Sequence, residues 1–200
     1  MVKVLKRVEK LGGKMYLIVG LGNPEPEYSK TRHNMGFDVI NKLAKQYGIE
    51  LLRSNFEGIY GTGIIENEKV ILLKPQTYMN LSGQSIKKYI DFYKIPLENI
   101  LVVFDDMDTE KEKIKIRKMG GPGTHNGAKS VVHELQSEQF ARIRVGIGRP
   151  IDNDEIIEYV ITPIQDEQEY KQLEIGIEKA KDAIIEYLKN GIDKAMNKFN

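Results

Sequence analysis

Residues 16–33 read YLIVGLGNPEPEYSKTRH, an apolar run that leads through two glycines into a polar loop. Short apolar runs are typical of buried strands, and in α/β folds ligands bind at the carboxyl ends of such strands. The arrangement recurs along the chain: polar clusters follow an apolar run or a glycine-rich loop at Tyr78-Met79-Asn80, Asp105-Asp106 and His125-Asn126-Gly127. The sequence therefore predicts that one His, three Asn and one Asp meet in a common crevice.

Strands and helices alternate along the rest of the chain. Apolar runs predict strands over residues 16–20, 100–104 and 142–147, another near 113–117, and a hairpin over 57–65 and 69–73. Helical spacing of apolar residues predicts helices over 35–47, 82–93, 127–135 and 166–189, with Gly191 as a stop and a short helix after it. This order predicts an α/β fold, a single globular domain with a mixed, mostly parallel β-sheet flanked by helices on both faces.

Composition narrows the class of protein. The chain has 200 residues, of which 40% are hydrophobic and 30% charged, a balance that fits one globular domain with a sizeable core. No apolar stretch approaches the ~20 residues needed to span a bilayer. With no cysteine, disulfides, Cys-ligated zinc and Cys nucleophiles are excluded, and a reducing compartment is favoured. We therefore expect a soluble cytoplasmic protein without a membrane segment.

Residues 1–14 differ in character from the rest. They hold five bases against one acid, Glu9, and lack the apolar region that a secretory signal requires. Because the first predicted strand starts directly after them, we interpret them as an N-terminal extension, non-native or disordered. The domain itself is expected over residues 15–200.

Charge is segregated along the chain although the formal net charge is only +1. Residues 111–149 carry nine bases against three acids, a net charge of +6. Residues 150–178 carry nine acids against one base, a net charge of −8. Such a division indicates either a basic face that binds a polyanion or a solvated surface whose charges happen to segregate.

Two glycine-rich turns invite a nucleotide-binding interpretation. The turn Gly20-Leu21-Gly22 follows a strand, but the third glycine of a dinucleotide fingerprint would fall at Glu25, and no helix opens there. The loop 120–124 precedes a helix but lacks the Gly-Lys-Ser/Thr ending of a P-loop. Both turns are therefore interpreted as structural, with phosphate contact still open for the second because bases flank it.

His33 is the candidate general base, because an imidazole with a pKa near 6.5 can accept a proton at neutral pH. Asp105 is a candidate to orient it, and Asn80 and Asn126 to position a water. No Ser or Cys nucleophile is signalled, so water or a substrate hydroxyl is the expected attacker. A rival interpretation has Asp105, Asp106 and Asp108 hold Mg²⁺ for phosphoryl transfer. The histidines at 33, 125 and 133 have no close metal spacing, which disfavours zinc.

The motifs together resemble those of bacterial peptidyl-tRNA hydrolase. The resemblance rests on residues 17–24 with Thr31-Arg32-His33-Asn34, residues 74–83, Phe104-Asp105-Asp106-Met107-Asp108, Gly123-Thr124-His125-Asn126-Gly127 and residues 142–150, in family order from about residue 15 to the C-terminus. It implies hydrolysis of the ester that joins a peptide to the terminal ribose of tRNA, which recycles tRNA for translation. It also implies a monomeric enzyme of one α/β domain, with no cofactor, no metal and no obligate protein partner.

The resemblance also assigns roles to individual residues. It implies that His33 is the general base, that Asp105 orients it, and that Asn23 contacts the peptide backbone. Asn80 and Asn126 would position substrate or water and stabilise the oxyanion, with Met79 shaping the cleft. The tRNA end would be bound by Tyr28, Tyr78, Arg117 and Arg144. These roles suit the residues, because an ester is cleaved more easily than an amide and RNA ends are commonly held by aromatic stacking and phosphate contacts.

Departures from the family pattern are few: Thr124 stands where Gly is common, Pro122 lies in the preceding loop, and Phe104 replaces a frequent Tyr or His. None removes a named catalytic group, although loop mobility and tRNA affinity stay open. Two other classes remain as alternatives. A non-catalytic RNA-binding protein would not need the whole set of His33, Asp105 and the asparagines, and a Mg²⁺-dependent phosphotransferase would lose activity in EDTA.

Overall fold

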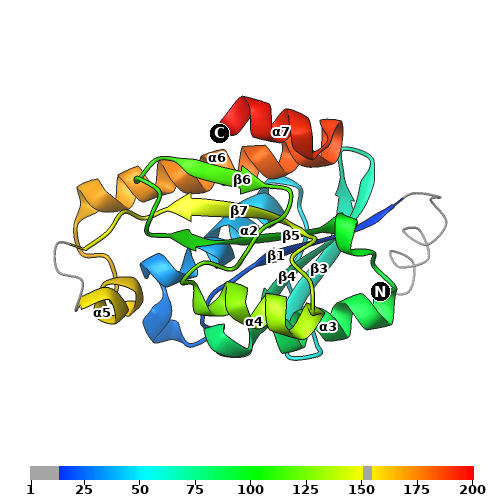
Figure 1. The fold of residues 1–200 in the computed structure, drawn as a ribbon, viewed down its shortest axis with the longest axis horizontal. Helices are drawn as coiled ribbons and strands as arrows, with labels where there is room; N and C mark the ends of the chain where they lie inside the picture. Colours follow the sequence, from blue (N-terminus) through cyan, green and yellow to red (C-terminus); the bar gives the residue numbers. More distant parts are fainter. Residues whose placement is uncertain (1–13, 151–154) are drawn as a thin grey trace.

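A seven-stranded sheet forms the centre of the computed structural model, which describes residues 14–150 and 155–200 (Figure 1). The strands are β1 (Met15–Gly20), β2 (Arg53–Asn55), β3 (Gly58–Ile65), β4 (Glu68–Pro75), β5 (Ile100–Asp106), β6 (Ile114–Arg117) and β7 (Ala141–Gly146), in the order β2-β3-β4-β1-β5-β7-β6. The central strands β4, β1, β5 and β7 are parallel, and antiparallel pairs lie at both edges. The predicted mixed, mostly parallel sheet is confirmed. The expected N-terminal extension, apart from Lys14, falls outside the described residues.

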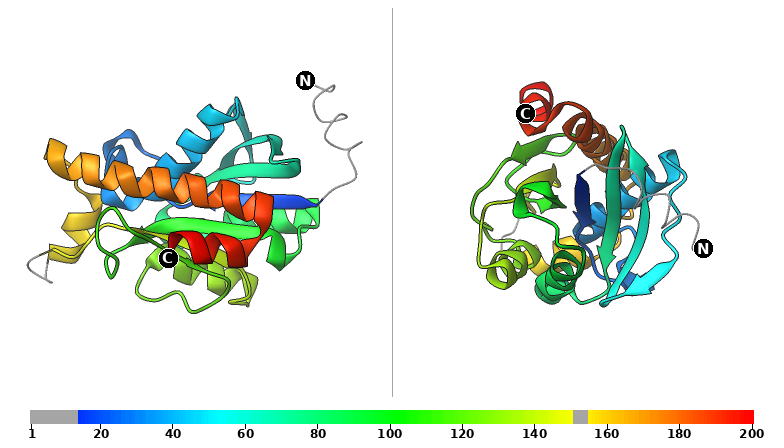
Figure 2. Two further views of the ribbon diagram at one scale, coloured as in Figure 1. Left: turned by 90° about the horizontal axis from the view of Figure 1, so that it is seen from above. Right: turned by 90° about the vertical axis from the view of Figure 1, so that its right-hand side faces the viewer.

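Helices cover both faces of this sheet, as predicted. They are α2 (Met35–Gln46), α3 (Ser82–Tyr93), α4 (Asn126–Leu135), α5 (Ile156–Ile161), α6 (Glu167–Asn190) and α7 (Ile192–Phe199). In the part of the chain that the structure describes, single 3-10 turns join them to the strands: η1 (Pro26–Tyr28), η2 (Arg32–Asn34), η3 (Met79–Leu81) and η4 (Leu97–Asn99). Helices α2, α6 and α7 pack on one face, and α3 and α4 on the other (Figure 2). Within the described residues, no helix has the length and apolarity that a membrane crossing requires.

The central strands are apolar at successive positions because helices cover both faces of the sheet. Leu17 and Val19 of β1 contribute to the core under α3 and α4, whereas Ile18 between them contributes to the core under α2 and α6. All three side chains are fully buried. Alternate residues of a strand point to opposite faces, so a strand with a helix layer on each side needs apolar residues at every position.

The end of β1 and the start of α2 lie in direct backbone contact. A Cβ added at Gly20 would lie 2.0 Å from the carbonyl oxygen of Gly36, and one added at Gly36 would lie 2.5 Å from the backbone nitrogen of Leu21. Only glycine fits at both positions. This close approach holds η2, the turn immediately before α2, against the carboxyl end of β1, and η2 carries His33.

Two elements were not predicted. Strand β2 is three residues long and has no apolar run, since it pairs only at the edge of the sheet. Helix α5 has six residues, and Val160 is the one buried among them in the described structure. The predicted hairpin is confirmed as β3 and β4, and its turn places Glu66 and Asn67 in the left-handed region.

Candidate active site

A cleft of about 420 Å³ opens beside the carboxyl ends of β1, β4 and β5. Its lining includes the predicted residues Asn23, His33, Tyr78, Met79, Asn80, Asp105, Asn126 and Arg144. The remaining predicted residues, Tyr28 and Arg117, do not belong to the lining that the described residues form around this cleft. Segments that are far apart in sequence therefore converge here, because the parallel strands end at the same edge of the sheet.

Asp105 is the centre of the polar floor. It lies at the end of β5, and its side chain is 3% exposed. Its Oδ1 is 3.0 Å from His33 Nδ1 and 2.9 Å from His125 Nε2, and its Oδ2 is 3.1 Å from His33 Nδ1. Burial raises the pKa of this carboxyl, but the two imidazoles outweigh burial and hold the pKa well below its usual range. Asp105 is therefore an ionised acceptor shared by two rings.

An ionised Asp105 fixes the tautomer of His33. Since a carboxylate can only accept, Nδ1 of His33 must carry the proton that it donates, which leaves the lone pair on Nε2. The described residues provide no hydrogen-bond partner for Nε2, and the ring lines the cleft. Burial lowers the pKa of His33, but Asp105 more than compensates, and the pKa lies above its ordinary value of 6.5. The ring is thus a base whose protonated form is stabilised by the carboxylate of Asp105 at Nδ1.

His125 belongs to a polar cluster noted in the sequence, but no role was predicted for it. It is the N-cap of α4, where Nδ1 accepts from the backbone N–H of Ala128 at 3.1 Å. Nδ1 must therefore be unprotonated, so that Nε2 carries the proton donated to Asp105. The ring centroid lies 5.0 Å from that of His33. The sequence signal for this residue is its position directly before a helix and after a glycine-rich loop.

Residue types alone would allow a metal ion at His33, Asp105 and His125, whose ligand atoms lie within 4.8 Å of one another. Sequence spacing did not predict this cluster, because the fold assembles it from three separate segments. The hydrogen bonds argue against a metal, since Ala128 occupies one nitrogen of His125 and the other carries a proton. A metal ligand needs a free lone pair, and His125 has none to give here.

The three acids of residues 105–108 do not face a common point. Asp106 Oδ2 accepts from the hydroxyl of Thr109 at 2.5 Å, and Asp108 pairs with Arg149. Asp105 faces the two histidines instead. The geometry therefore does not support the magnesium alternative, which required the carboxylates to converge.

Asn23 is held so that its amide nitrogen remains for a ligand. Its Oδ1 accepts from the backbone N–H of Met79 at 2.9 Å. No role was predicted for Asn34 from the sequence. Its side chain bonds the backbone of Asn23 twice: Oδ1 accepts from the Asn23 N–H at 2.8 Å, and Nδ2 donates to the Asn23 carbonyl at 3.0 Å. Because Oδ1 is occupied, Nδ2 is the polar group that Asn23 offers to the cleft.

The other predicted polar residues are more exposed. Asn80 and Asn126 are exposed at the cleft, and the side chain of Tyr78 is 54% exposed at its rim. Met79 is buried beneath them, with its sulfur against Gly127, where a Cβ would lie 2.5 Å away. Glycine at position 127 therefore lets Met79 fill the space between η3 and α4.

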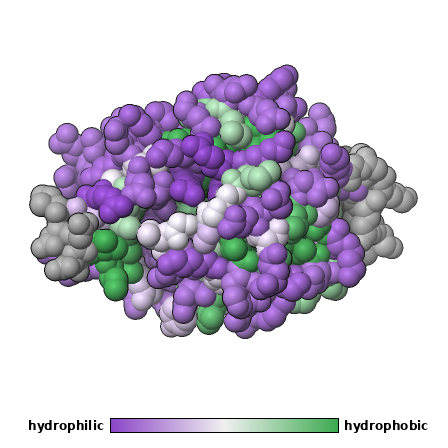
Figure 3. Space-filling view, in the orientation of Figure 1, coloured by the Kyte–Doolittle hydropathy of each residue, from purple (hydrophilic) through white to green (hydrophobic). Residues whose placement is uncertain are grey.

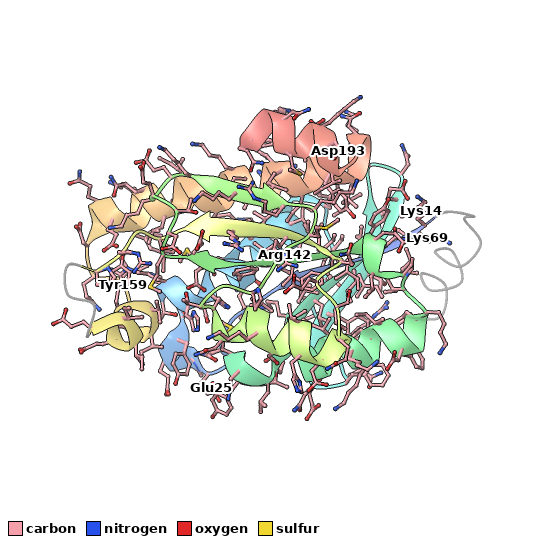
Figure 4. The ribbon with its side chains drawn as sticks, in the orientation of Figure 1. Lys14, Glu25, Lys69, Arg142, Tyr159 and Asp193 are labelled. Carbon is pink, nitrogen blue, oxygen red and sulfur yellow. The ribbon has the colours of Figure 1, made fainter. Side chains whose placement is uncertain are left out.

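Strands β6 and β7 carry a cationic face beside the cleft. Register pairs Lys115 with Arg144 and Arg117 with Arg142. The expected phosphate-binding residues Arg117 and Arg144 thus lie on neighbouring strands, two register positions apart. Arg142 is fully buried and donates to the carbonyl of Gly121 at 3.2 Å, and burial lowers its pKa to about 10 (Figure 4). This arginine fixes the glycine-rich loop from below.

The acidic excess of residues 150–178 is partly structural. Lys42 of α2 pairs with Glu174 and Glu178 of α6, at 2.9 and 2.6 Å, and Glu169 pairs with Arg32 at 2.6 Å. These contacts join helices of the same layer. Part of the charge segregation seen in the sequence therefore serves packing, whereas Arg144 of the basic half lines the cleft and Arg117 is exposed beside it on β6.

One wall of the cleft is apolar. Helix α5 contributes Ile156, Ile157, Val160 and Ile161 to the lining. Ile157 is 73% exposed, and hydrophobic atoms reach the surface where α5 lies (Figure 3). The cleft thus combines a polar, proton-sharing floor with an apolar side wall.

Comparison with known proteins gives a consistent result. The model of the family described as peptidyl-tRNA hydrolase matches residues 17–200. The peptidyl-tRNA hydrolase of Caldanaerobacter subterraneus subsp. tengcongensis is 50% identical over 186 residues, which is 93% of this chain and all of that protein. That of Clostridium novyi is 49% identical over 187 residues, covering 93% of this chain and 98% of the relative. The crystal structure of peptidyl-tRNA hydrolase from Acinetobacter baumannii superposes with a TM-score of 0.85 at 39% identity, covering 92% of this chain and 93% of that one.

Proposed function

Because this chain belongs to the peptidyl-tRNA hydrolase family and is a hydrolase, we propose that it cleaves peptidyl-tRNA with His33 as the general base. The bond broken is the ester between the peptide C-terminus and the terminal ribose, and its cleavage returns tRNA to translation. The observation that carries this proposal is the pairing of His33 Nδ1 with Asp105 at 3.0 Å, which leaves Nε2 as the base at the cleft.

In the proposed mechanism, Nε2 of His33 takes a proton from water as the water oxygen attacks the ester carbonyl. The imidazolium that forms is stabilised by the ionised carboxylate of Asp105, 3.0 Å from Nδ1. When the tetrahedral intermediate collapses, the bond to the ribose oxygen breaks and the imidazolium returns the proton to that oxygen. The products are a tRNA with an intact terminal ribose and a peptide with a free carboxyl group, which releases its proton to solvent at neutral pH.

Amide groups would stabilise the charge on the attacked carbonyl. Asn23 offers Nδ2 because its oxygen is bonded to the N–H of Met79, and this favours a contact to the peptide carbonyl. Asn80 and Asn126 line the same cleft and would position the water and the oxyanion. The mechanism requires no metal, since the general base and the amide donors supply proton transfer and charge stabilisation for an ester.

The tRNA end would lie along the rim and the cationic face. Tyr78 is exposed at the rim and suits stacking on a base, and Tyr28 of η1 is the second aromatic residue proposed for this role. Arg144 lines the cleft and Arg117 is exposed on β6, where both suit phosphate contacts. We further propose that the protein acts in the cytoplasm as a monomer, and the lack of cysteine supports a reducing compartment.

The test is release of free tRNA from N-blocked aminoacyl-tRNA and from the unblocked form, in the presence of EDTA. We expect selective, EDTA-resistant cleavage of the blocked form, and its loss in His33→Ala with tRNA binding retained. His133→Ala is the matched control, because that imidazole is 79% exposed on α4 and lies outside the cleft lining. Binding without cleavage would favour an RNA-binding protein, and loss of activity in EDTA would favour metal chemistry.

A further inference from the structure

Helix α5 forms a wall of the cleft, but few of its own side chains are buried against the rest of the protein. It has six residues, with Val160 as its single buried side chain in the described structure and Ile157 73% exposed. Helices this short are not stable alone, and tertiary contacts normally supply their stability. The position of α5 must therefore be set by contacts made from outside the helix.

Arg32 supplies the main polar contact to α5. The residue opens η2, one position before His33, and its side chain is 11% exposed. Its Nη1 donates to the backbone carbonyl of Tyr159 at 2.8 Å, and its guanidinium carbon lies 4.0 Å from the centre of the Tyr159 ring. The hydroxyl of Tyr159 in turn donates to the carbonyl of Ile147 at 2.6 Å. Figure 4 labels Tyr159 on α5, near the end of the sheet.

The other edge of the same guanidinium is fixed to α6. Its Nε donates to Glu169 Oε1 at 3.0 Å and its Nη2 to Oε2 at 2.6 Å, a bidentate pair. Lys111 also pairs with Glu169, at 2.7 Å. Burial raises the pKa of Glu169, but the two cations outweigh it and hold the pKa below its usual value. Arg32 thus joins α5 to an anchored carboxylate on the long helix.

The backbone adds a second connection directly after α5. Thr31 forms an isolated antiparallel bridge with Pro163, and the N–H of Ile164 donates to the carbonyl of Lys30 at 3.0 Å. The segment after α5 is therefore attached to the residues directly before η2. One short turn carries both the base, His33, and the attachment of the apolar wall.

We propose that Arg32 is a positioning residue that seats α5 against the cleft and thereby sets how tightly the peptide part of the substrate is held. The proposal rests on the proposed function for its kinetic consequence. Apparent affinity falls in proportion to the fraction of molecules in the binding-competent arrangement. If loss of the guanidinium leaves α5 seated in about one molecule in ten, KM rises about tenfold while the chemistry at His33 is unchanged.

The position of α5 can be measured without substrate, because the chain has no native cysteine. Cysteines introduced at Glu158 of α5 and His133 of α4, both exposed, would carry one spin label on the apolar wall and one on α4. We expect the distance distribution between the labels to broaden in Arg32→Met and to remain broad in Arg32→Lys, since one ammonium cannot reach both Glu169 and the carbonyl of Tyr159 as the planar guanidinium does. Lys42→Met is the control, because it removes two ion pairs of α6 that do not involve α5.

Kinetics separate positioning from a direct effect on the base. In both Arg32 variants we expect KM for N-blocked aminoacyl-tRNA to rise about tenfold, kcat to stay within about twofold, and the pH profile of kcat to stay unchanged. An unaltered label distance in Arg32→Met, or its full restoration in Arg32→Lys, would overturn the proposal. So would a fall in kcat with a shifted pH profile at constant KM. If the wild-type protein failed to cleave the substrate, the proposed function would fail, while the label distances would still test the anchor.

Discussion

Asp105→Asn tests the proposed base directly, because the structure determines how the new amide must lie. His125 is fixed as an Nε2–H donor by its bond to Ala128, so the amide oxygen must take the place of Oδ1. The amide nitrogen then takes the place of Oδ2, which is 3.1 Å from His33 Nδ1. Nδ1 of His33 can donate to the amide oxygen as before. It can also accept from the amide nitrogen, but His33 is then in the wrong tautomer, with its proton on Nε2. The variant therefore weakens the base without deleting it.

The expected loss follows from the charge that is removed. A hydrogen bond to a charged group contributes about 1.5–3 kcal/mol, and at about 1.4 kcal/mol per decade this corresponds to a roughly 10- to 150-fold fall in kcat. Solvent does not screen this interaction appreciably, because Asp105 is 3% exposed. Deleting the base in His33→Ala should cost more, about 10²- to 10⁴-fold. The structure thus predicts an ordered pair of losses.

The pH dependence of activity shows in which direction Asp105 shifts the pKa of His33. Asp105 holds the pKa of His33 above 6.5, so activity of the wild type should rise with pH through an inflection above that value. In Asp105→Asn the charge that raises the pKa of His33 is gone, so burial lowers this pKa, and the inflection of the activity profile should move below pH 6.5. The assay is kcat/KM for N-blocked aminoacyl-tRNA against pH, with EDTA present. Asp106→Asn is the matched control, because that carboxylate bonds Thr109 and not the histidines.

Two results would refute this reasoning. Turnover in Asp105→Asn equal to that of the wild type would mean that the carboxylate does not support the base. An inflection that stayed in place or moved upward would mean that the titrating group is not His33 in contact with Asp105. Circular dichroism and the melting temperature of each variant would identify any loss that comes from unfolding.

Three further predictions concern residues around the site. His125→Phe should lower kcat by about tenfold, through the lost bond to Asp105, and lower stability by about 1 kcal/mol, through the lost N-cap, as followed by kinetics and urea unfolding. Arg144→Ala should raise KM with little change in kcat and reduce the salt dependence of tRNA binding by the equivalent of about one phosphate contact, measured by titration at several salt concentrations. Burial raises the pKa of Asp38 to about 6, so its ionisation opposes folding at neutral pH; Asp38→Asn should stabilise the protein by up to about 3 kcal/mol at pH 7.5 and by much less at pH 4.

Much of the fold was predictable because its signals are local. The runs that became β1 and β5 are apolar at every position, since helices cover both faces of the sheet. Strand β2 and helix α5 were missed for the opposite reason. An edge strand of three residues and a helix with one buried side chain leave no periodic pattern, because neighbours determine their conformation.

The site divides in a similar way between local and assembled features. Polar residues directly after strands mark Asn23 and Asp105 from sequence, because strand ends define the edge of the sheet. The role of His125 depends on which ring nitrogen faces Ala128, a detail that spacing along the chain does not contain. The same holds for the acids near residue 106, which form a cluster in sequence but bond in separate directions in space.

The two sides of the cleft are held by different physical means, and this difference bears on what each can do. The base side is fixed by the backbone contact of Gly20 with Gly36 and by buried hydrogen bonds, so His33 and Asp105 cannot move without disturbing the sheet. The apolar side is a short helix attached through one guanidinium, 2.8 Å from a carbonyl of α5, through the hydroxyl of Tyr159 and through backbone contacts directly after the helix. Rigid placement suits proton transfer, which depends steeply on geometry, whereas a lightly attached wall can adjust to peptides of different shape. Loosening that wall should therefore alter binding of the peptide before it alters the chemistry.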